Sequence, residues 1–472
     1  MINKLFTSFL KFSFGGIVAA FISFAALPFI TDQLNPDEYG RGSMYLLAYH
    51  LLLNLSLLGL DQSFVRYFYA EDYKESRKKL LINTFVPVLI FASFLFLLLL
   101  AFWQPISNTL VDHNNFELIA ILAAAIFFGV NEKFTLLIVR MSQRGVLFSM
   151  LRIVQSITNV GVTLLYLYLI EDSFIALAYG SASSALITFL IALYFERENF
   201  SFESRQLNKQ DIKSFLRYGL PFLPTFIIVW IFQSMDKFGL RYFSDFNEIG
   251  FYSAAFKIVS VLTILQTGFT SFWTPIAFET YEKSTAEGKA LFSNVFRGLS
   301  SLLLFAGLMI IIFRDVLIIL FDSEYGEAAA TVPFLVFIPV MYTMSEITVG
   351  GINFKNKTSN HLWIAIAAAI VNLIGVIILV PAFGARGAAL STGIAYVVFF
   401  YARTLISVKY YPIDFKLMQT SNSIVIVFIV AYFNTFYADL YVLVAVDLAG
   451  ILGFILINFK DMNRMVRKIL RK

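Results

Sequence analysis

Apolar residues fill fourteen segments of this chain, and short polar stretches separate one segment from the next. Each segment has about 20 residues, the length at which an α-helix crosses the hydrocarbon core of a bilayer. The strands of a membrane barrel would be about 10 residues long and would alternate between apolar and polar positions. The pattern therefore predicts an all-α integral membrane protein with helices at 12–31, 41–60, 81–103, 116–140, 147–170, 173–195, 215–240, 249–272, 295–321, 329–352, 360–383, 386–408, 420–438 and 440–459.

Basic residues are unevenly divided between the two sets of segment ends. Of the 36 lysines and arginines, 29 lie at one set of ends and five at the other, while Lys133 and Lys257 lie inside segments. Because basic residues concentrate in cytoplasmic loops, this bias places both termini in the cytoplasm. The longest polar stretches, 61–80 and 196–214, then also face the cytoplasm, and no loop is long enough to form an independent active site.

The composition supports a membrane protein and narrows its chemistry. The 472 residues are 59% hydrophobic and 14% charged, whereas soluble domains carry roughly 25% charged residues. The chain has no cysteine, which excludes disulfides and thiol chemistry, and its three histidines are too few and too scattered for a metal cluster. The first apolar run follows Lys4 and Lys11 and continues into a membrane-length segment, so we expect no cleavable signal peptide.

Two pairs of matching stretches indicate an internal repeat. LNPDEYGRGS and SDFNEIGFYS each place an acid two residues before a glycine and a serine three residues after it, so Ser43 matches Ser253 at an offset of 210. Further along, Gly180 matches Gly393 at an offset of 213. Six segments separate the copies, and an even number makes them parallel repeats about an axis along the membrane normal.

The repeat predicts two six-helix lobes around a central cavity, followed by two extra helices. The expected parts are an N-terminal lobe at 1–196, a cytoplasmic linker at 197–214, a C-terminal lobe at 215–410, and the extra helices with a basic cytoplasmic tail at 411–472.

Lys257 is the clearest candidate for a functional charge. It lies about 12 Å into its segment, near mid-membrane, where a charge costs roughly 2.5–3.5 kcal/mol. Ser253, Ser260 and Thr267 share its helical face, and such a polar stripe is typical of a cavity wall. The structural alternative is a salt bridge with a neighbour such as Glu346.

Two other segments carry polar stripes with structural alternatives. A polar stripe runs along the second segment and consists of His50, Asn54 and Asp61. These residues either line a cavity or form hydrogen bonds between helices. The segment at 147–170 carries Arg152, Gln155, Asn159 and Thr163. Arg152 is near the cytoplasmic end, so it either contacts a ligand or extends to the membrane surface.

Three further charged sites complete the candidates. Glu132 and Lys133 are adjacent deep in one segment and diverge around the helix, so we expect at least one of them to reach the cavity. Arg66 lies at the cytoplasmic mouth, as a ligand contact or only as part of the positive-inside bias. Glu346 is either an acid that couples protons or sodium or a counter-ion to Lys257 or Lys133. Asp447 has no role that the pattern explains.

These intramembrane sites are mostly basic, which suits an anionic ligand, and a diphosphate is a strong candidate. The candidate ligand contacts from the residues alone are Lys257, Lys133, Arg66, Arg152 and Asn159. Glu346, Asp61 and Glu132 are candidates for ion coupling by H⁺ or Na⁺. We expect no metal site and no other cofactor.

The chain resembles the polysaccharide-transporter branch of the multidrug/oligosaccharidyl-lipid/polysaccharide exporter superfamily, which includes Wzx-type O-antigen flippases. The resemblance rests on Asp236-Lys237-Phe238, Glu248-Ile249-Gly250, Tyr252-Ser253 and Lys257. Three longer stretches also resemble the family in the right order: FISFAALPFITDQLNPDEYG, YGLPFLPTFIIVWIFQSMDKF and VNLIGVIILVPAFGARGAALSTGIAY.

The resemblance implies a flippase, not an enzyme, that moves a polyprenyl-diphosphate-linked oligosaccharide across the bacterial cytoplasmic (inner) membrane by alternating access. It adds Asp236 and Lys237 to Lys257 as substrate-binding positions. The implied partners are the lipid-linked glycan, the bilayer, and the polymerase and glycosyltransferases of a surface-polysaccharide pathway, with no nucleic acid. O-antigen, capsule and exopolysaccharide all fit such a pathway.

Other functions remain open at this stage. A multidrug exporter of the same superfamily would favour acidic cavity residues, which Glu132 and Glu346 supply but Lys257 and Lys133 oppose. A flippase for a lipid II-type peptidoglycan precursor shares the same charge logic. A membrane polymerase or ligase would need catalytic groups on a sizeable outer loop, and the outer loops here are short.

Overall fold

A computed structural model describes residues 2–70, 77–200, 207–283, 286–357 and 359–470, which are helical with no strand among them. Eleven of these helices are long and apolar enough to cross a membrane, or up to 13 when each of two bent pairs is one span. The predicted all-α membrane fold is thus confirmed, whereas the count of 14 is not. One element, α19 (Ser359–Tyr410), covers both of the segments expected at 360–383 and 386–408.

The chain divides into two compact units, residues 1–230 and 231–472. The division falls inside α12 (Phe222–Phe243), and the lobes and linker expected from the sequence stay a prediction. The last residues of the linker expected at 197–214 belong to α11 (Lys209–Gly219). Residues 201–206 of that linker lie outside the described part of the chain. Residues 71–76 of the expected cytoplasmic stretch also lie outside it.

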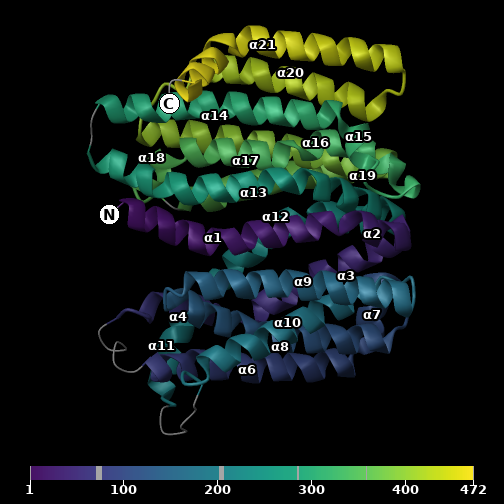
Figure 1. The fold of residues 1–472 in the computed structure, drawn as a ribbon, viewed down its shortest axis with the longest axis vertical. Coiled ribbons are helices and arrows are strands. Elements are labelled where there is room, and N and C mark those ends of the chain that lie inside the picture. The colour runs from purple at the N-terminus through teal and green to yellow at the C-terminus, as the bar shows by residue number, and fades with distance from the viewer. Residues whose placement is uncertain (1, 71–76, 201–206, 284–285, 358, 471–472) are drawn as a thin grey trace. The chain divides into compact units, whose positions relative to one another are not determined.

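The first unit is built around three long helices that lie side by side, with α10 packed along both α8 and α9 (Figure 1). Phe64, Phe85, Phe134 and Phe215 form the centre of an apolar cluster at one end. The helices of this unit are α1 (Ile2–Ala25), α2 (Leu27–Gln33), α3 (Pro36–Ser56), α4 (Leu60–Tyr67), α6 (Arg77–Ala101), α7 (Trp103–Val111), α8 (Phe116–Met141), α9 (Gly145–Leu169), α10 (Ile175–Glu196) and α11.

The second expected segment is broken in the structure. Leu58 and Gly59 both have left-handed backbone angles, with φ values of 53° and 68°, and α3 and α4 meet at 53°. A Cβ on Gly59 would lie 2.2 Å from the carbonyl oxygen of Gly219, so the bend brings α4 against α11. The stripe predicted to run from His50 to Asp61 is therefore wrong, because Asp61 lies beyond the bend.

In the second unit α17 packs along α19, and α14, α20 and α21 lie together, as Figure 1 shows. The elements are α13 (Phe246–Glu282), α14 (Ala286–Ile312), α15 (Arg314–Ile318), the 3₁₀ helix η2 (Ser323–Ala330), α16 (Val332–Leu335), α17 (Phe337–Thr348), α18 (Gly350–Phe354), α19, α20 (Leu417–Phe436) and α21 (Leu440–Leu470).

The two units begin their repeated helices in the same way. Asn35 caps α3 by accepting a hydrogen bond from the Glu38 backbone N–H at 2.9 Å. Asp245 caps α13 by accepting from the Glu248 backbone N–H at 3.0 Å. Both pairs are separated by 210 positions, the offset read from the sequence. Side-chain caps of this kind satisfy amide groups that have no partner inside the helix.

Glu38 and Glu248 then each cap a second helix. The carboxylate of Glu38 accepts from the backbone N–H of Phe174 at 2.8 Å, where α10 begins without a cap of its own. The carboxylate of Glu248 accepts from the backbone N–H of Ala385 at 2.6 Å. That contact lies beside Gly384, whose φ of 52° breaks α19. We call these two contacts the interhelical caps.

The C-terminal helices α20 and α21 are joined to α14 of the same unit by a buried polar side chain. Asn458 on α21 donates to the Ser423 hydroxyl on α20 at 2.8 Å and accepts from the Ser301 hydroxyl on α14 at 3.0 Å. Hydrogen bonds of this kind join helices where lipid offers no partner.

Asp447, which the sequence left unexplained, has a contact of the same kind. It accepts a hydrogen bond from Asn434 of α20 at 2.7 Å and lies within electrostatic reach of Arg314. Asp447 therefore joins the last two helices to each other.

Candidate functional site

In the first unit a chain of three polar side chains links the inside of the helix bundle to its surface. Glu132 on α8 is only 5% exposed and accepts a hydrogen bond from the Gln155 amide on α9. The same amide accepts from the Arg152 guanidinium through its oxygen at 2.7 Å. Arg152 is itself exposed. We call Arg152, Gln155 and Glu132 the polar relay.

The structure thus brings together three residues that the sequence analysis had placed on two different segments, Glu132 on one and Arg152 and Gln155 on the next. Arg152 and Gln155 lie on one face of α9 because they are three positions apart. The pairing of Gln155 with Glu132 depends on how α8 and α9 are packed, which the sequence pattern does not give.

Lys133 and Asn159 lie near the relay but are not part of it. Lys133 follows Glu132 on α8 and is exposed, because adjacent residues on a helix point about 100° apart. Asn159 is partly buried on α9, where its backbone carbonyl packs against Gly180 of α10. This placement agrees with the expected divergence of Glu132 and Lys133 around their helix.

Arg66 and Asp61 lie on the short helix α4. Arg66 is exposed in its last turn, with its guanidinium carbon 6.0 Å from the ring centre of Tyr67. Asp61 accepts a hydrogen bond from the neighbouring Gln62 at 2.8 Å. Neither contact reaches another helix.

In the second unit Asp236 and Lys237 of α12 lie near the first third of α13. Asp236 is 5% exposed and accepts hydrogen bonds from the Tyr252 hydroxyl and from the Lys237 backbone N–H. Lys237 and Lys257 lie close enough for their charges to interact. The motif residues Asp236, Lys237, Tyr252 and Lys257 are therefore neighbours in space.

Lys257 is partly exposed on α13, and among the described residues no carboxylate forms an ion pair with it. Two other members of its predicted stripe bond to their own helix. The Ser260 hydroxyl donates to the Lys257 carbonyl at 2.6 Å, and the Thr267 hydroxyl donates to the Thr263 carbonyl at 2.9 Å. Hydroxyls bound to their own helix in this way need no polar cavity, whereas the charged Lys257 side chain does need a partner from outside its helix.

Glu346 has a different partner from the lysines that the sequence analysis considered. The Arg403 guanidinium on α19 contacts the Glu346 carboxylate on α17 at 2.7 Å and the Ser345 hydroxyl at 2.7 Å. Arg403 is 8% exposed and lies over the rings of Tyr342 and Phe399. The expectation of a lysine counter-ion is therefore wrong.

Sequence reasoning missed Arg403 because it counted that residue with the cytoplasmic basic groups at the end of a segment. The signal available was the acid itself, since a lone intramembrane carboxylate calls for a cation on a neighbouring helix.

Asn372 is a second residue that the sequence analysis missed. It is fully buried on α19 and accepts a hydrogen bond from the Ser391 hydroxyl at 2.7 Å, across the break at Gly384. It lies 213 positions after Asn159, which is the offset of the second repeat match. That offset was the signal that would have found it.

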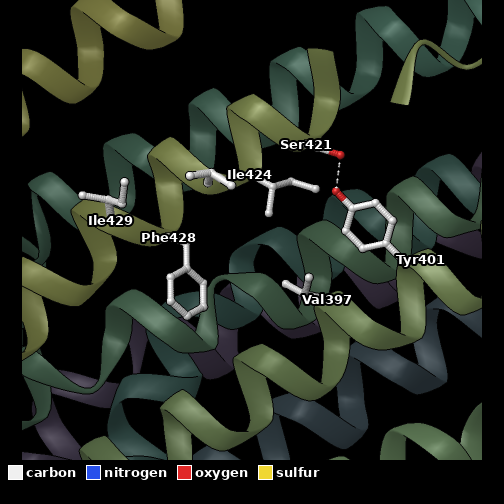
Figure 2. A pocket seen from close by; sticks show the side chains of 7 residues that line it. Val397, Tyr401, Ser421, Ile424, Phe428 and Ile429 are labelled. Carbon is white, nitrogen blue, oxygen red and sulfur yellow. Dashed lines mark hydrogen bonds between the residues drawn. The ribbon is translucent and has the colours of Figure 1, made fainter. Parts of the chain in front are cut away.

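One pocket of the second unit lies between α19 and α20, and Figure 2 shows it from close by. Its volume is about 210 Å³, and its lining is apolar apart from Tyr401 and Ser421, whose hydroxyls are 2.6 Å apart. The lining residues are Val397, Tyr401, Ser421, Ile424, Val425, Phe428 and Ile429. With no cation in its lining, this pocket suits a hydrocarbon chain and not a diphosphate.

The fold is shared with known transporters. The chain resembles the lipid II flippase MurJ in an inward closed conformation, with a TM-score of 0.65, 17% identity, and coverage of 97% of this chain and 99% of that one. It also resembles a multidrug resistance MATE family transporter of the MOP superfamily in an inward-facing conformation, with a TM-score of 0.62, 15% identity, and coverage of 86% and 94%. At these identities the likeness shows the fold.

A curated relative comes from Methanocaldococcus jannaschii, where it is described as the uncharacterized membrane protein MJ1068. The two chains are 26% identical over 293 residues, which is 58% of this chain and 57% of the relative. The chain thus matches little more than half the length of that relative.

The sequence profile described as polysaccharide biosynthesis protein matches residues 7–280. The match covers more than half of the chain. It includes the polar relay, the motif around Asp236, and Lys257. The chain therefore belongs to the polysaccharide biosynthesis protein family.

Proposed function

We propose that the protein is a flippase that moves a polyprenyl-diphosphate-linked oligosaccharide across the bacterial cytoplasmic membrane by alternating access, with both termini in the cytoplasm. The family match and the fold shared with MurJ and MATE transporters support this proposal. The product would supply a surface polysaccharide such as O-antigen, capsule or exopolysaccharide. The pathway's polymerase and glycosyltransferases are the proposed partners.

The observation that carries the proposal is the contrast between the intramembrane acids and cations. Glu346 is paired with Arg403, Asp236 is bonded to Tyr252, and Glu132 is bonded to Gln155. Lys257 has no such acidic partner among the described residues. A mid-membrane cation without a carboxylate partner needs an anion from elsewhere, and the diphosphate of the carrier lipid supplies one.

Arg152, Lys133, Arg66, Lys237 and Asn159 are proposed as further groups that contact the substrate during transport, and Asp236 as a group that positions Lys237. Glu132, Asp61 and Glu346 are the proposed carboxylates for coupling by H⁺ or Na⁺. Lysine and arginine suit the task because they attract a diphosphate and still release it when the substrate leaves.

The test is to delete the gene in its host and to profile polyprenyl-linked saccharides by mass spectrometry together with the surface polysaccharide. We expect one complete lipid-linked repeat unit to accumulate and one surface polymer to disappear. Complementation with Lys257→Ala should leave the block in place, whereas wild-type protein should relieve it. Unchanged lipid-linked pools would overturn the proposal.

Two other cargoes follow from the fold comparison. The likeness to MurJ over 97% of the chain favours a lipid II-type precursor as the next candidate, and accumulation of that lipid in the deletion strain would identify it. A MATE-like drug exporter would instead leave lipid-linked pools unchanged and make the strain sensitive to cationic dyes.

A further inference from the structure

The polar relay has a direction that follows from the chemistry of its members. The Arg152 guanidinium has hydrogen-bond donors and no acceptor, so the Gln155 side chain must present its oxygen to it. The Gln155 NH₂ group then faces Glu132, as the structure has it. The Glu132 oxygen in this contact must therefore accept a hydrogen bond, which an ionised carboxylate does at either oxygen.

A proton on Glu132 changes this arrangement. If the proton is on the oxygen that faces Gln155 and its O–H points at the amide, that oxygen donates, and the amide must rotate to accept. The amide then turns its NH₂ group toward Arg152, and two donors face each other. If the proton is on the other oxygen, the contact survives but loses its charge, and hydrogen bonds to charged groups are the stronger ones. In both cases the hold on Arg152 weakens.

We propose that Gln155 is a positioning residue that couples the proton on Glu132 to the availability of Arg152 for an anionic ligand such as a diphosphate. The proposal rests on the proposed function and adds a regulatory step to it. Protonation of Glu132 releases Arg152 and also removes a nearby negative charge, and both effects favour the anion. Because such coupling is reciprocal, anion binding draws a proton onto Glu132.

The surroundings of Glu132 leave few other groups to produce this effect. Arg152 of α9, Lys133 of α8 and Tyr49 of α3 are the charged and titratable side chains within its electrostatic reach. The helices packed against α8 carry most of their charges near their ends or on the short helix α4. These residues are Asp37, Glu38 and Arg41 at the start of α3; Glu196 on α10, paired with Arg144; Arg77, Lys78 and Lys79 on α6; and Asp61 and Arg66 on α4. His50, further along α3, is exposed. The sequence of α7 has no charged residue.

The test measures proton uptake on ligand binding. The full chain in lipid nanodiscs is titrated with inorganic pyrophosphate by calorimetry, in two buffers of different ionisation enthalpy at each of several pH values. Wild-type protein should take up more protons per bound pyrophosphate than Glu132→Gln, in which the carboxyl cannot titrate. Pyrophosphate affinity should rise on acidification by about fivefold or more beyond the rise seen in Glu132→Gln.

Substitutions at position 155 then separate coupling from folding. Gln155→Leu and Gln155→Met should bind pyrophosphate but lose most of the additional proton uptake. Gln210→Leu, at the exposed start of α11, is the matched control and should behave as wild type. Thermal unfolding of each variant shows which remain folded, and two variants at position 155 keep the test usable if one of them does not.

The outcomes distinguish this inference from the proposed function. If Arg152→Ala weakens pyrophosphate binding but wild type and Glu132→Gln take up equal numbers of protons, the coupling is overturned and the anion site stands. If no pyrophosphate binds to the wild-type protein, the anion site is overturned and the coupling with it.

Discussion

The two units share their interhelical caps but differ in the partners of their intramembrane acids. Glu38 and Glu248 make the same contact at the start of a later helix, 210 positions apart. In the first unit the buried acid Glu132 reaches an exposed arginine through an amide. In the second unit Glu346 contacts a buried arginine directly.

This difference separates parts of the repeat that hold the fold from parts that are free to change. A cap that both copies retain serves the helix packing that both copies need. Charges that the copies place differently serve tasks that the copies do not share. The second unit also neutralises Glu346 internally and leaves Lys257 without an acid, whereas the first unit connects its acid to the surface.

The largest expected effect comes from breaking the direct pair in the second unit. Arg403→Met leaves the Glu346 carboxylate, which is only 13% exposed, without its cation and should cost about 3–5 kcal/mol of stability. The double variant Arg403→Met with Glu346→Met should recover most of that loss, because an apolar pair removes both charges. Unfolding of the purified protein in detergent measures both. Arg152→Met, which removes the exposed arginine of the first unit, is the matched comparison and should cost far less.

Lys257 tests whether the second unit depends on a free cation. Lys257→Ala should reduce transport by roughly 10- to 150-fold, the equivalent of about 1.5–3 kcal/mol for a hydrogen bond to a charged group. Lys257→Arg should retain more transport than Lys257→Gln if charge is the requirement. The measurement is export of surface polysaccharide at matched membrane levels of each variant. Near-normal export by Lys257→Ala would contradict a diphosphate contact.

The interhelical caps should give equal and smaller effects in the two units. Glu38→Ala and Glu248→Ala should each cost about 0.5–2 kcal/mol, the usual range for loss of a helix cap. Their effects should add, because the two caps have no shared partner. Hydrogen exchange should speed up at Phe174 in the first variant and at Ala385 in the second. Effects confined to one unit would show that the repeat does not extend to these contacts.

The smallest expected effect is at the C-terminal helix pair. Ser423→Ala removes one hydrogen bond to Asn458 and should cost about 0.6 kcal/mol, the average for such bonds between membrane helices. A double-mutant cycle with Asn458→Leu isolates the bond from other contacts of Asn458. A coupling energy near zero would show that the Phe454 carbonyl, which also accepts from the Asn458 NH₂ group at 3.0 Å, satisfies this donor without Ser423.

Much of the fold could be predicted because membrane helices need long apolar runs, and the runs are visible in the sequence. The repeat was visible for a similar reason, since caps require particular residue types at fixed positions. The bend at Leu58 and Gly59 was not predicted, because it depends on the close approach of Gly59 to Gly219, far along the chain.

The candidate sites were predicted as single residues and not as pairs. Glu132, Gln155 and Arg152 were each identified from polarity in an apolar segment, but their contact requires the packing of α8 on α9. Glu346 was identified and its partner was missed, because Arg403 lies near a segment end, where basic residues are common. Helical spacing gives the face of a residue but not the neighbour that this face meets.

The polar group that joins α14, α20 and α21 has a consequence for biogenesis. Ser301 is synthesised 157 residues before Asn458, to which it donates a hydrogen bond. The insertion machinery therefore releases α14 into lipid with this hydroxyl lacking its final acceptor, and the contact can form only when the last helix arrives. Until then the Ser301 hydroxyl can bond only to its own helix, at the Arg297 carbonyl 2.9 Å away, so the link between α14 and α21 is completed only after the final span has been synthesised.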